Sequence, residues 1–575
     1  MGASENKDNK YQEREMKLQS NNPQTKVVKK TLGAAIVAVS LAGVGTVQAI
    51  EIPTGNPDFN VRLDTTARYN VGVRVKSQDD AILNNANYDE SNSRFDSGDV
   101  VTNRVDLLTE LDVVYKRRYG ARVSAAAWYD HAYNDDVVNT SDNNVYYPGS
   151  GVWGPSTPSY FDGRYSNETK RRHHGPSGEI LDAFLFGTFD LGAVPVNVRA
   201  GRHNIYWGQG ILFAGHGIAF AQGPIDGLKA VTSPGTEARE LYLPVNQLSA
   251  QANVTSNLSI SGQYFLEWEP TRAAQGGTFL GAGDVALLGP DQLPIAPGYA
   301  IPFLDPNKPS DSGNWGVKAD YFLSGVGTFG FHYREFDEYA PWGVQTNVNP
   351  TTGAPVSAQY VYAEDVSLYG LSWGGDAFGA SAGIDFSYRK DVPLSSSRFI
   401  DGEGARGETL HMAVNGLWGL TPTSLWDTGT LIAEIAVAHL VDVNSNESLY
   451  KGEGYGCEDK DVGCSTDNFV GAAVNFNPQW LQVRPGVDVT GLFSLNYGLY
   501  GNAAHGGGNE GMYNYKVGVR GVWQRNFQVD LAYNGYGGNL ETETFPEGEV
   551  VVGSNGSNAA LSDRDWVSLT LSYAF

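Results

Sequence analysis

Cysteine, methionine and positive charge are all scarce in this sequence. Its 575 residues include two cysteines and four methionines, and 40 lysine and arginine residues face 64 aspartate and glutamate residues. The formal net charge of −24 argues against a nucleic-acid partner, because such a partner requires a basic surface. Long apolar runs are missing as well: beyond residue 49, no stretch reaches the roughly 18 apolar residues of a membrane-spanning helix. The sequence therefore excludes a helical membrane protein.

Local motifs of catalysis are also absent. No G-x-S-x-G, H-E-x-x-H or paired Cys/His signature occurs, and the glycines between 208 and 217 do not match a dinucleotide fingerprint, which needs a β-α-β frame. We therefore expect no enzymatic activity, no cofactor and no bound metal. An enzyme with a spatially assembled triad leaves no local trace, so an outer-membrane enzyme stays as a third alternative.

Glycine and aromatic residues are, by contrast, abundant. The chain has 70 glycines, and aromatic side chains make up 12 % of it. Glycine weakens helix interiors and suits turns, whereas aromatic side chains concentrate where a membrane meets water. This composition favours a turn-rich β protein.

The N-terminus has the order of a secretory signal peptide. A positively charged stretch over 26–30 precedes an apolar stretch over 32–46 and a small-residue cleavage motif that ends at Ala49. A membrane anchor is the alternative, but no positively charged stop-transfer sequence follows. We expect residues 1–49 to be a signal peptide with an N-terminal extension, and residues 50–575 to form a single exported domain.

Apolar and polar residues alternate beyond residue 57. This period of two predicts β-strands, because successive side chains of a strand point to opposite faces. In the last strand, Trp566, Ser568, Thr570 and Ser572 take one face, and the other face carries Val567, Leu569, Leu571, Tyr573 and Phe575.

Short and long connections take turns along the chain. Tight links such as 116–119 and 524–526 alternate with long polar stretches such as 135–178 and 444–467. A soluble β-sandwich has no reason to place every long loop on one side, whereas outer-membrane barrels have short periplasmic turns and long extracellular loops. We therefore predict an all-β transmembrane antiparallel barrel of about 18 strands, with 16 as the alternative, in the Gram-negative outer membrane with both termini periplasmic.

The chain ends in an aromatic pair. Tyr573 and Phe575 resemble the C-terminal signal that the barrel assembly machinery recognises in outer-membrane proteins. The expected partners are therefore this machinery, outer-membrane lipid and lipopolysaccharide, and a small-molecule solute.

Charged residues on the predicted strands must face the lumen. A charge at the bilayer midplane costs about 2–4 kcal/mol on the lipid face of a barrel. These residues either set the field of a pore or join across the lumen in salt bridges. The candidates on the strands are Arg104, Asp106, Glu110, Arg122, Arg199, His203, Glu434, Lys516 and Arg520.

The stretch 207–244 differs from the other long loops because it is apolar and rich in glycine. It begins at Trp207 and contains Asp226, which we add to the candidates for the constriction. Many large apolar side chains would be costly in open water, and glycines allow the tight turns of a loop that folds inward. We predict that 207–244 enters the barrel as a constriction; a loop packed outside is the alternative.

The two cysteines lie in one loop. Cys457 and Cys464 are expected to form a disulfide, because the protein is exported and no histidine of this loop completes a metal site. The acidic residues of this loop either form a solvated face or hold Ca²⁺, and no ligand spacing stands out.

Three stretches resemble a known family. These are 198–208 (VRAGRHNIYWG) with 223–226 (GPID), 363–372 (AEDVSLYGLS) and 388–393 (YRKDVP). They resemble a proteobacterial outer-membrane β-barrel family of unknown function. The resemblance covers about 57–575 and implies handling of hydrophobic compounds. It also implies that the barrel is often encoded with a periplasmic lipoprotein-like companion and an inner-membrane permease of the resistance–nodulation–division class. Gln209 stands where the family usually has an acidic residue.

The expected function is a channel or transporter for small molecules, including hydrophobic ones. A barrel that serves as a platform for surface interaction through acidic loops is the second alternative. A lumen of 16–18 strands favours transport, because barrels of that size leave an aqueous channel.

Overall fold

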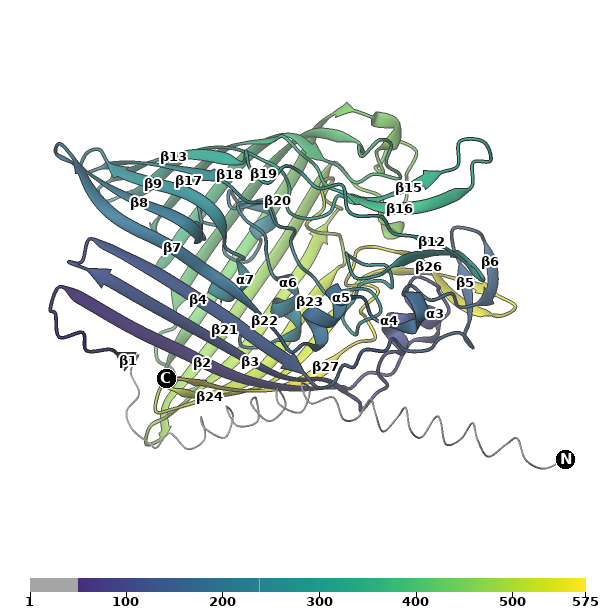
Figure 1. Ribbon diagram of the computed structural model, residues 1–575, viewed down its shortest axis with the longest axis horizontal. Coiled ribbons are helices and arrows are strands. Elements are labelled where there is room, and N and C mark those ends of the chain that lie inside the picture. The colour runs from purple at the N-terminus through teal and green to yellow at the C-terminus, as the bar shows by residue number, and fades with distance from the viewer. Residues whose placement is uncertain (1–49, 237) are drawn as a thin grey trace, which may run out of the picture. The chain divides into compact units, whose positions relative to one another are not determined.

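The computed structural model describes residues 50–236 and 238–575, so the predicted signal peptide over 1–49 lies outside the described residues. Eighteen antiparallel strands form one closed sheet, in which each strand pairs with its neighbours and β27 returns to β2. The predicted barrel of 18 strands is confirmed, and the alternative of 16 is wrong (Figure 1). In order around the barrel the strands are β2 (Phe59–Arg74), β3 (Val100–Tyr115), β4 (Tyr119–Asp130), β7 (Ser177–Leu191), β8 (Val194–His203), β9 (Val245–Asn253), β10 (Leu258–Phe265), β13 (Trp315–Leu323), β14 (Gly327–Phe336), β17 (Val366–Ala377), β18 (Ala380–Pro393), β19 (Arg406–Gly419), β20 (Thr428–Ser445), β21 (Asn468–Arg484), β22 (Val487–Tyr500), β23 (Tyr513–Trp523), β24 (Phe527–Gly537) and β27 (Trp566–Ala574).

The connections differ sharply between the two ends of the barrel. Short turns join the strands at one end, which we call the turn end, and the long loops L1 to L9 join them at the loop end. The sequence predicts a turn at 375–377, but β17 continues to Ala377, and Phe378 and Gly379 make the turn with positive φ. The loops are L1 (75–99), L2 (131–176), L3 (204–244), L4 (266–314), L5 (337–365), L6 (394–405), L7 (446–467), L8 (501–512) and L9 (538–565).

The loops carry the remaining elements. Four hairpins project from them, and β1 adds two residues to the edge of β2. None of the helices in the described part of the chain is long and apolar enough to cross a membrane. These elements are β1 (Ile50–Glu51), α3 (Asp80–Leu83), α4 (Asp89–Ser93), β5 (Asn144–Tyr147), β6 (Val152–Pro155), η1 (Phe161–Gly163), α5 (Asn167–Thr169), η2 (Lys170–His174), η3 (Ala214–His216), α6 (Gly227–Thr232), α7 (Ala238–Leu241), β11 (Gln292–Ala296), β12 (Tyr299–Pro302), β15 (Gly343–Val348), β16 (Pro355–Val361), η4 (Glu447–Leu449), η5 (Lys460–Val462), β25 (Leu540–Phe545) and β26 (Gly548–Ser554).

The outer face of the barrel is apolar. Leu185 is 66 % exposed and Ile435 is 52 % exposed, although Glu434, the residue before Ile435, is buried toward the lumen. Such a band of exposed apolar side chains around the whole wall is typical of barrels that span a membrane.

Aromatic side chains border this band toward both ends. Near the loop end, Tyr333, Tyr369 and Tyr388 stand side by side on neighbouring strands, with ring centroids 5.0 and 6.2 Å apart. Near the turn end, the rings of Phe59 and Tyr115 lie 4.7 Å apart. These two belts match the aromatic girdles by which transmembrane barrels meet both water interfaces.

Candidate constriction in the barrel lumen

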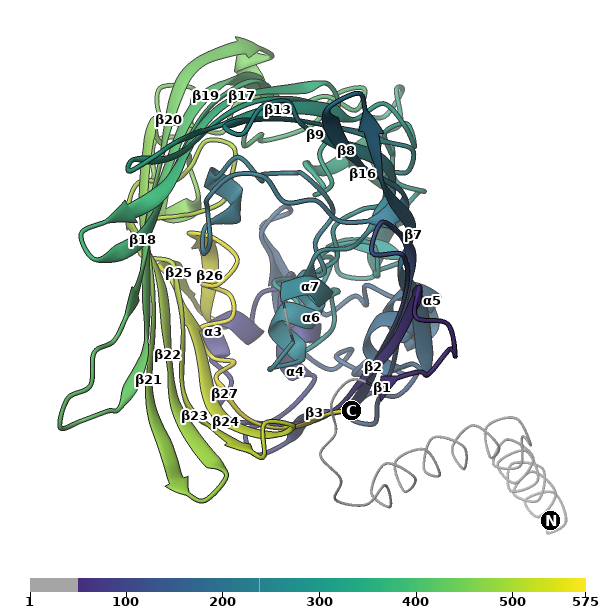
Figure 2. The same ribbon diagram turned by 90° about the vertical axis from the view of Figure 1, so that its left-hand side faces the viewer.

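L3, residues 204–244, enters the barrel, and we call it the constriction segment. Its first arm, 204–222, is mostly irregular and contains η3, and its second arm, 223–244, contains α6 and α7. Viewed along the barrel, α6 and α7 lie inside the ring of strands (Figure 2). The apolar, glycine-rich composition that predicted an inserted loop therefore belongs to a segment that lies in the lumen.

Two wall carboxylates bind the backbone N–H groups of the first arm. Asp385 of β18 accepts from Gln209, Gly210 and Ile218 at 2.8–3.1 Å. Irregular backbone inside a barrel is tolerated only where it finds polar partners, and a carboxylate is a strong acceptor for N–H groups. The second carboxylate is Glu434 of β20, which accepts from Ile211, Leu212 and Phe213 at 2.7–3.0 Å.

Two wall guanidinium groups bind the carbonyl groups of the same arm. Arg334 of β14 donates to the carbonyl groups of Ile218, Phe220 and Ala221 at 2.5–3.0 Å. Arg334 and the second residue, Arg389, are fully buried, so carbonyl dipoles take the place of water around their charges. The second is Arg389 of β18, which donates to Gly215 and Gly217 at 2.9 and 3.1 Å.

Glycine permits the close approach at one point in particular. Gly208 has a φ of +90°, and a Cβ atom there would lie 2.5 Å from Oδ2 of Asp385. Any larger residue at this position would push the first arm away from its carboxylate.

The second arm is anchored by ion pairs. Glu240 of α7 lies 2.6 Å from Arg68 of β2, and Lys229 of α6 lies 3.1 Å from Glu179 of β7. Between the two helices, Ser233 donates a hydrogen bond of 3.1 Å to Asp106 of β3.

The two sets of anchors stand on opposite sides of the barrel. Eight strands separate β3, which carries Asp106, from β18, which carries Asp385, in either direction around the ring. The constriction segment therefore crosses the lumen from wall to wall.

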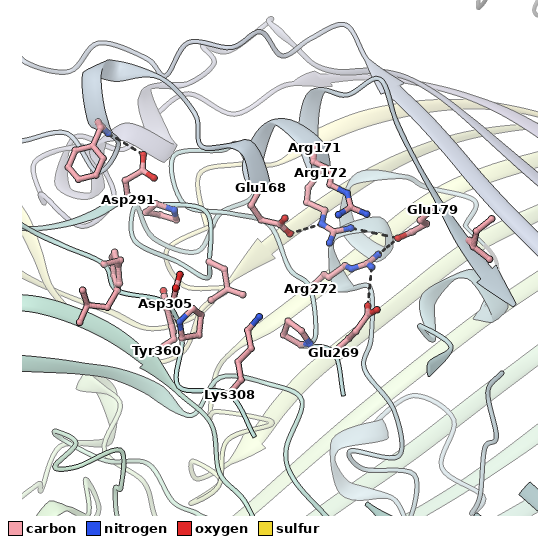
Figure 3. Close-up of a pocket in the computed structure, with 18 of the residues that line it drawn as sticks. Glu168, Arg171, Arg172, Glu179, Glu269, Arg272, Asp291, Asp305, Lys308 and Tyr360 are labelled. Carbon is pink, nitrogen blue, oxygen red and sulfur yellow. Dashed lines mark hydrogen bonds and ion pairs between the residues drawn. The ribbon is translucent and has the colours of Figure 1, made fainter. Parts of the chain in front are cut away.

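Cavities remain on either side of this segment. A cavity of about 380 Å³, lined by Arg199 and Lys318 among others, lies against the first arm toward the turn end. A second, of about 740 Å³, lies at the loop end among L2 and L4. In the second cavity Arg272 pairs with Glu179 at 2.8 Å and approaches Glu269, while Lys308 stands apart (Figure 3). Because Arg272 also pairs with Asp226 of the second arm at 3.2 Å, this cavity borders the constriction segment.

Three histidines meet where the first arm touches the wall and L8. His216, His411 and His505 bring ring nitrogens within 4.8 Å of one another. Arg389 lies 3.3 Å from Nε2 of His505, and a guanidinium is a poor neighbour for a cation, so we assign this cluster to hydrogen bonding. Nε2 of His216 lies 3.3 Å from the carbonyl oxygen of Gly507 and Nδ1 lies 3.2 Å from Nδ1 of His411. Burial, aided by Arg389, lowers the pKa of His216 to about 3.

The candidate residues from the sequence fall into three groups. Asp106, Trp207, Asp226 and Glu434 belong to the constriction segment or contact it. The second group contains residues bound within the wall or buried beside it: Arg104 (paired with Asp106), Glu110 (buried), Arg122 (paired with Asp112), His203 (2.8 Å from Oγ of Ser249) and Arg520 (paired with Asp530). The third group contains Arg199, which lines the cavity toward the turn end, and Lys516 of β23, whose neighbour in the strand, Val517, points outward.

Three wall anchors of the first arm were absent from the candidate list: Arg334, Asp385 and Arg389. Alternation along β14 and β18 would have found them, because they occupy positions between outward residues such as Phe331 and Phe386. The two cysteines predicted to pair, Cys457 and Cys464, are joined by a disulfide in L7.

Solved structures of bacterial outer-membrane proteins are among those similar to this chain. OccAB1 of Acinetobacter baumannii is 10 % identical, with 92 % of this chain and 98 % of that chain covered, at a TM-score of 0.42. OpdK of Pseudomonas aeruginosa, solved with vanillate, is also 10 % identical over 90 % and 98 % of the chains, at 0.38. The channel DcaP of A. baumannii is 11 % identical over 92 % and 100 %, at 0.35.

No curated protein matches the chain in sequence. The model of the family described as "Protein of unknown function (DUF1302)" matches residues 30–575. The match spans nearly the whole chain, including every barrel strand and the constriction segment. The protein belongs to the DUF1302 family.

Proposed function

We propose that the protein is a channel of the Gram-negative outer membrane for small molecules, and that the constriction segment sets the width of its lumen. The observation that carries the proposal is the crossing of the lumen between Asp385 and Asp106. A barrel of 18 strands leaves room for an aqueous channel, and a segment tied to both walls divides that room into narrow passages. Cavities of about 380 and 740 Å³ border the segment.

The difference between the two ends of the barrel supports one orientation in the membrane. Outer-membrane barrels place short turns in the periplasm and long loops outside the cell. We therefore place the turn end in the periplasm, where the companion and the permease implied by the family resemblance would meet it.

The proposal is tested by conductance. Purified protein inserted into a planar lipid bilayer should produce discrete current steps, smaller than those of an open barrel of this strand number, because the lumen is crossed. Detergent without protein is the control. Insertion without current steps, together with no release of small solutes from loaded liposomes, would contradict a channel.

A further inference from the structure

The pairing between β7 and β8 stops before the loop end of β7. β7 pairs with β4 from Ser177 onward, but its pairing with β8 ends at Ala183 and Arg202. Within the described residues, 177–182 therefore face no strand on their β8 side. In a closed barrel the backbone of each strand is normally satisfied on both edges, so this unpaired edge marks an opening in the wall.

The opening begins at the height of the apolar outer band. Ile180 points outward and is 52 % exposed, and it pairs with Ala125 of β4. Along β4, Ala125 precedes Tyr129, whose cross-strand partner Val105 pairs with Tyr69. Since Ile180 lies on the turn side of these tyrosines, the edge starts within the zone that contacts lipid.

The cavity of about 740 Å³ lies at this opening. Its lining includes the outward Ile180, and also Arg202, which lies two residues from Ala200, the partner of the outward Leu185. The lining also includes Glu179 and Arg272, which bind the second arm of the constriction segment inside the barrel. One continuous cavity therefore touches both the outer face and the lumen.

The lining is amphipathic. Arg202 is held on the outer rim by Glu267 at 2.6 Å and Glu269 at 3.2 Å, so its charge is neutralised there. Apolar side chains such as Phe303 and Leu304 line the same cavity. Paired charges beside apolar surface suit a molecule that has a polar end and an apolar body.

We infer that this opening is a lateral portal, through which small amphipathic molecules pass between the lumen and the outer leaflet of the membrane. The inference rests on the proposed channel function and assigns a second route to it. Water-soluble solutes take the path along the barrel axis, whereas solutes that partition into lipid take the portal.

The test blocks the portal from outside. In Ile180→Cys, the new thiol at the mouth is labelled with a bulky maleimide; the native cysteines are joined to each other and do not react. Leu185→Cys is the matched control, because Leu185 also points outward on β7, at 66 % exposure, but lies where β7 and β8 are paired. Flux of a fluorescent fatty-acid analogue and single-channel conductance in salt are both measured, and heat-modifiability shows that each labelled barrel is folded.

Loss of most of the fatty-acid flux in labelled Ile180→Cys, with conductance kept and labelled Leu185→Cys unchanged, is the expected result. Equal flux in the two labelled variants would overturn the portal while leaving the channel intact. A parental protein that shows neither conductance nor flux would overturn the proposed function and the portal with it.

Discussion

Four charged wall residues, Arg334, Asp385, Arg389 and Glu434, hold the backbone of the first arm in the lumen. Carboxylates face its N–H groups and guanidinium groups face its carbonyls, so each charge meets the favourable end of the peptide dipole. Hydrogen bonds to charged groups each contribute about 1.5–3 kcal/mol. Together they explain how an irregular segment stays in place without a strand partner.

Asp385→Asn should loosen the first arm. The asparagine keeps the shape of the side chain but loses the charge, and its amide N–H₂ opposes backbone N–H groups where a carboxylate oxygen accepted them. We expect a cost of about 3 kcal/mol, seen as larger or noisier single-channel currents.

The control for this substitution is Asp376→Asn. Asp376 of β17 is exposed and, in the described part of the chain, makes no hydrogen bond to the constriction segment. Identical current traces from the two variants would show that Asp385 does not hold the segment.

Acid should weaken the binding of the constriction segment to the barrel wall, because His216 then takes up a proton. Because burial lowers its pKa to about 3, the bound segment keeps His216 neutral, whereas a released segment takes up a proton below about pH 6.5. Stability of the bound state is therefore complete above pH 6.5 and falls progressively toward pH 3. We expect conductance to rise as the pH is lowered from 7 to 5.

The comparison is His216→Gln, which removes the imidazole that takes up the proton. This variant should show a smaller rise between pH 7 and 5. A rise of equal size in both proteins would exclude His216 as its source.

Among the elements, the strands and the inserted loop were predictable from the sequence. The wall residues that bind this loop, and the register of neighbouring strands, were not. Alternation along β20 placed Glu434 toward the lumen, and the glycines and large apolar groups of 207–244 indicated burial. The contact between Asp385 and Gly210 joins residues far apart in the chain, and an inward position shows only that a polar group is tolerated there. The parting of β7 and β8 is likewise a matter of register, which alternation does not fix.

The packing of L1 against L4 should weaken as the pH rises, which is the opposite of the pH dependence expected for His216. Asp89 and Glu90 of α4 are buried beside Asp284 of L4, which accepts hydrogen bonds from the backbone N–H groups of Glu90 and Ser91. Burial, together with the charge of Asp284, raises the pKa of Asp89 to about 8. A raised carboxyl pKa stabilises the packed loops while the group is protonated, and this stability is lost as the pH rises from about 4 through 8.

Hydrogen exchange measures this directly. After correction for intrinsic rates, amides of 80–95 should lose protection between pH 6 and 9, and Asp89→Asn should keep it. A parental protein whose protection stays constant over that range would contradict the assignment.

At the scale of the whole molecule, the last residue closes the barrel. Phe575 exchanges two backbone hydrogen bonds with Thr65 of β2, at 2.7 and 2.8 Å, and its ring lies 5.8 Å from that of Tyr573. Phe575→Ser keeps both backbone bonds but removes the aromatic end. We expect synthesis to continue while the amount of heat-modifiable protein in outer membranes collapses.

Ala574→Ser, on the same strand, is the control for this prediction and should assemble normally. Normal outer-membrane levels of Phe575→Ser would mean that the terminal aromatic residue is not an assembly signal in this protein.

Single-channel conductance after removal of the constriction segment shows whether this segment narrows a continuous lumen. Residues 211–222 are replaced by a short Gly-Ser bridge, and the control trims 346–357 from the β15–β16 hairpin of L5 by the same length. We expect a higher conductance and passage of larger solutes for the first variant, and the parental value for the second. If both variants conduct like the parental protein, the segment does not narrow the lumen.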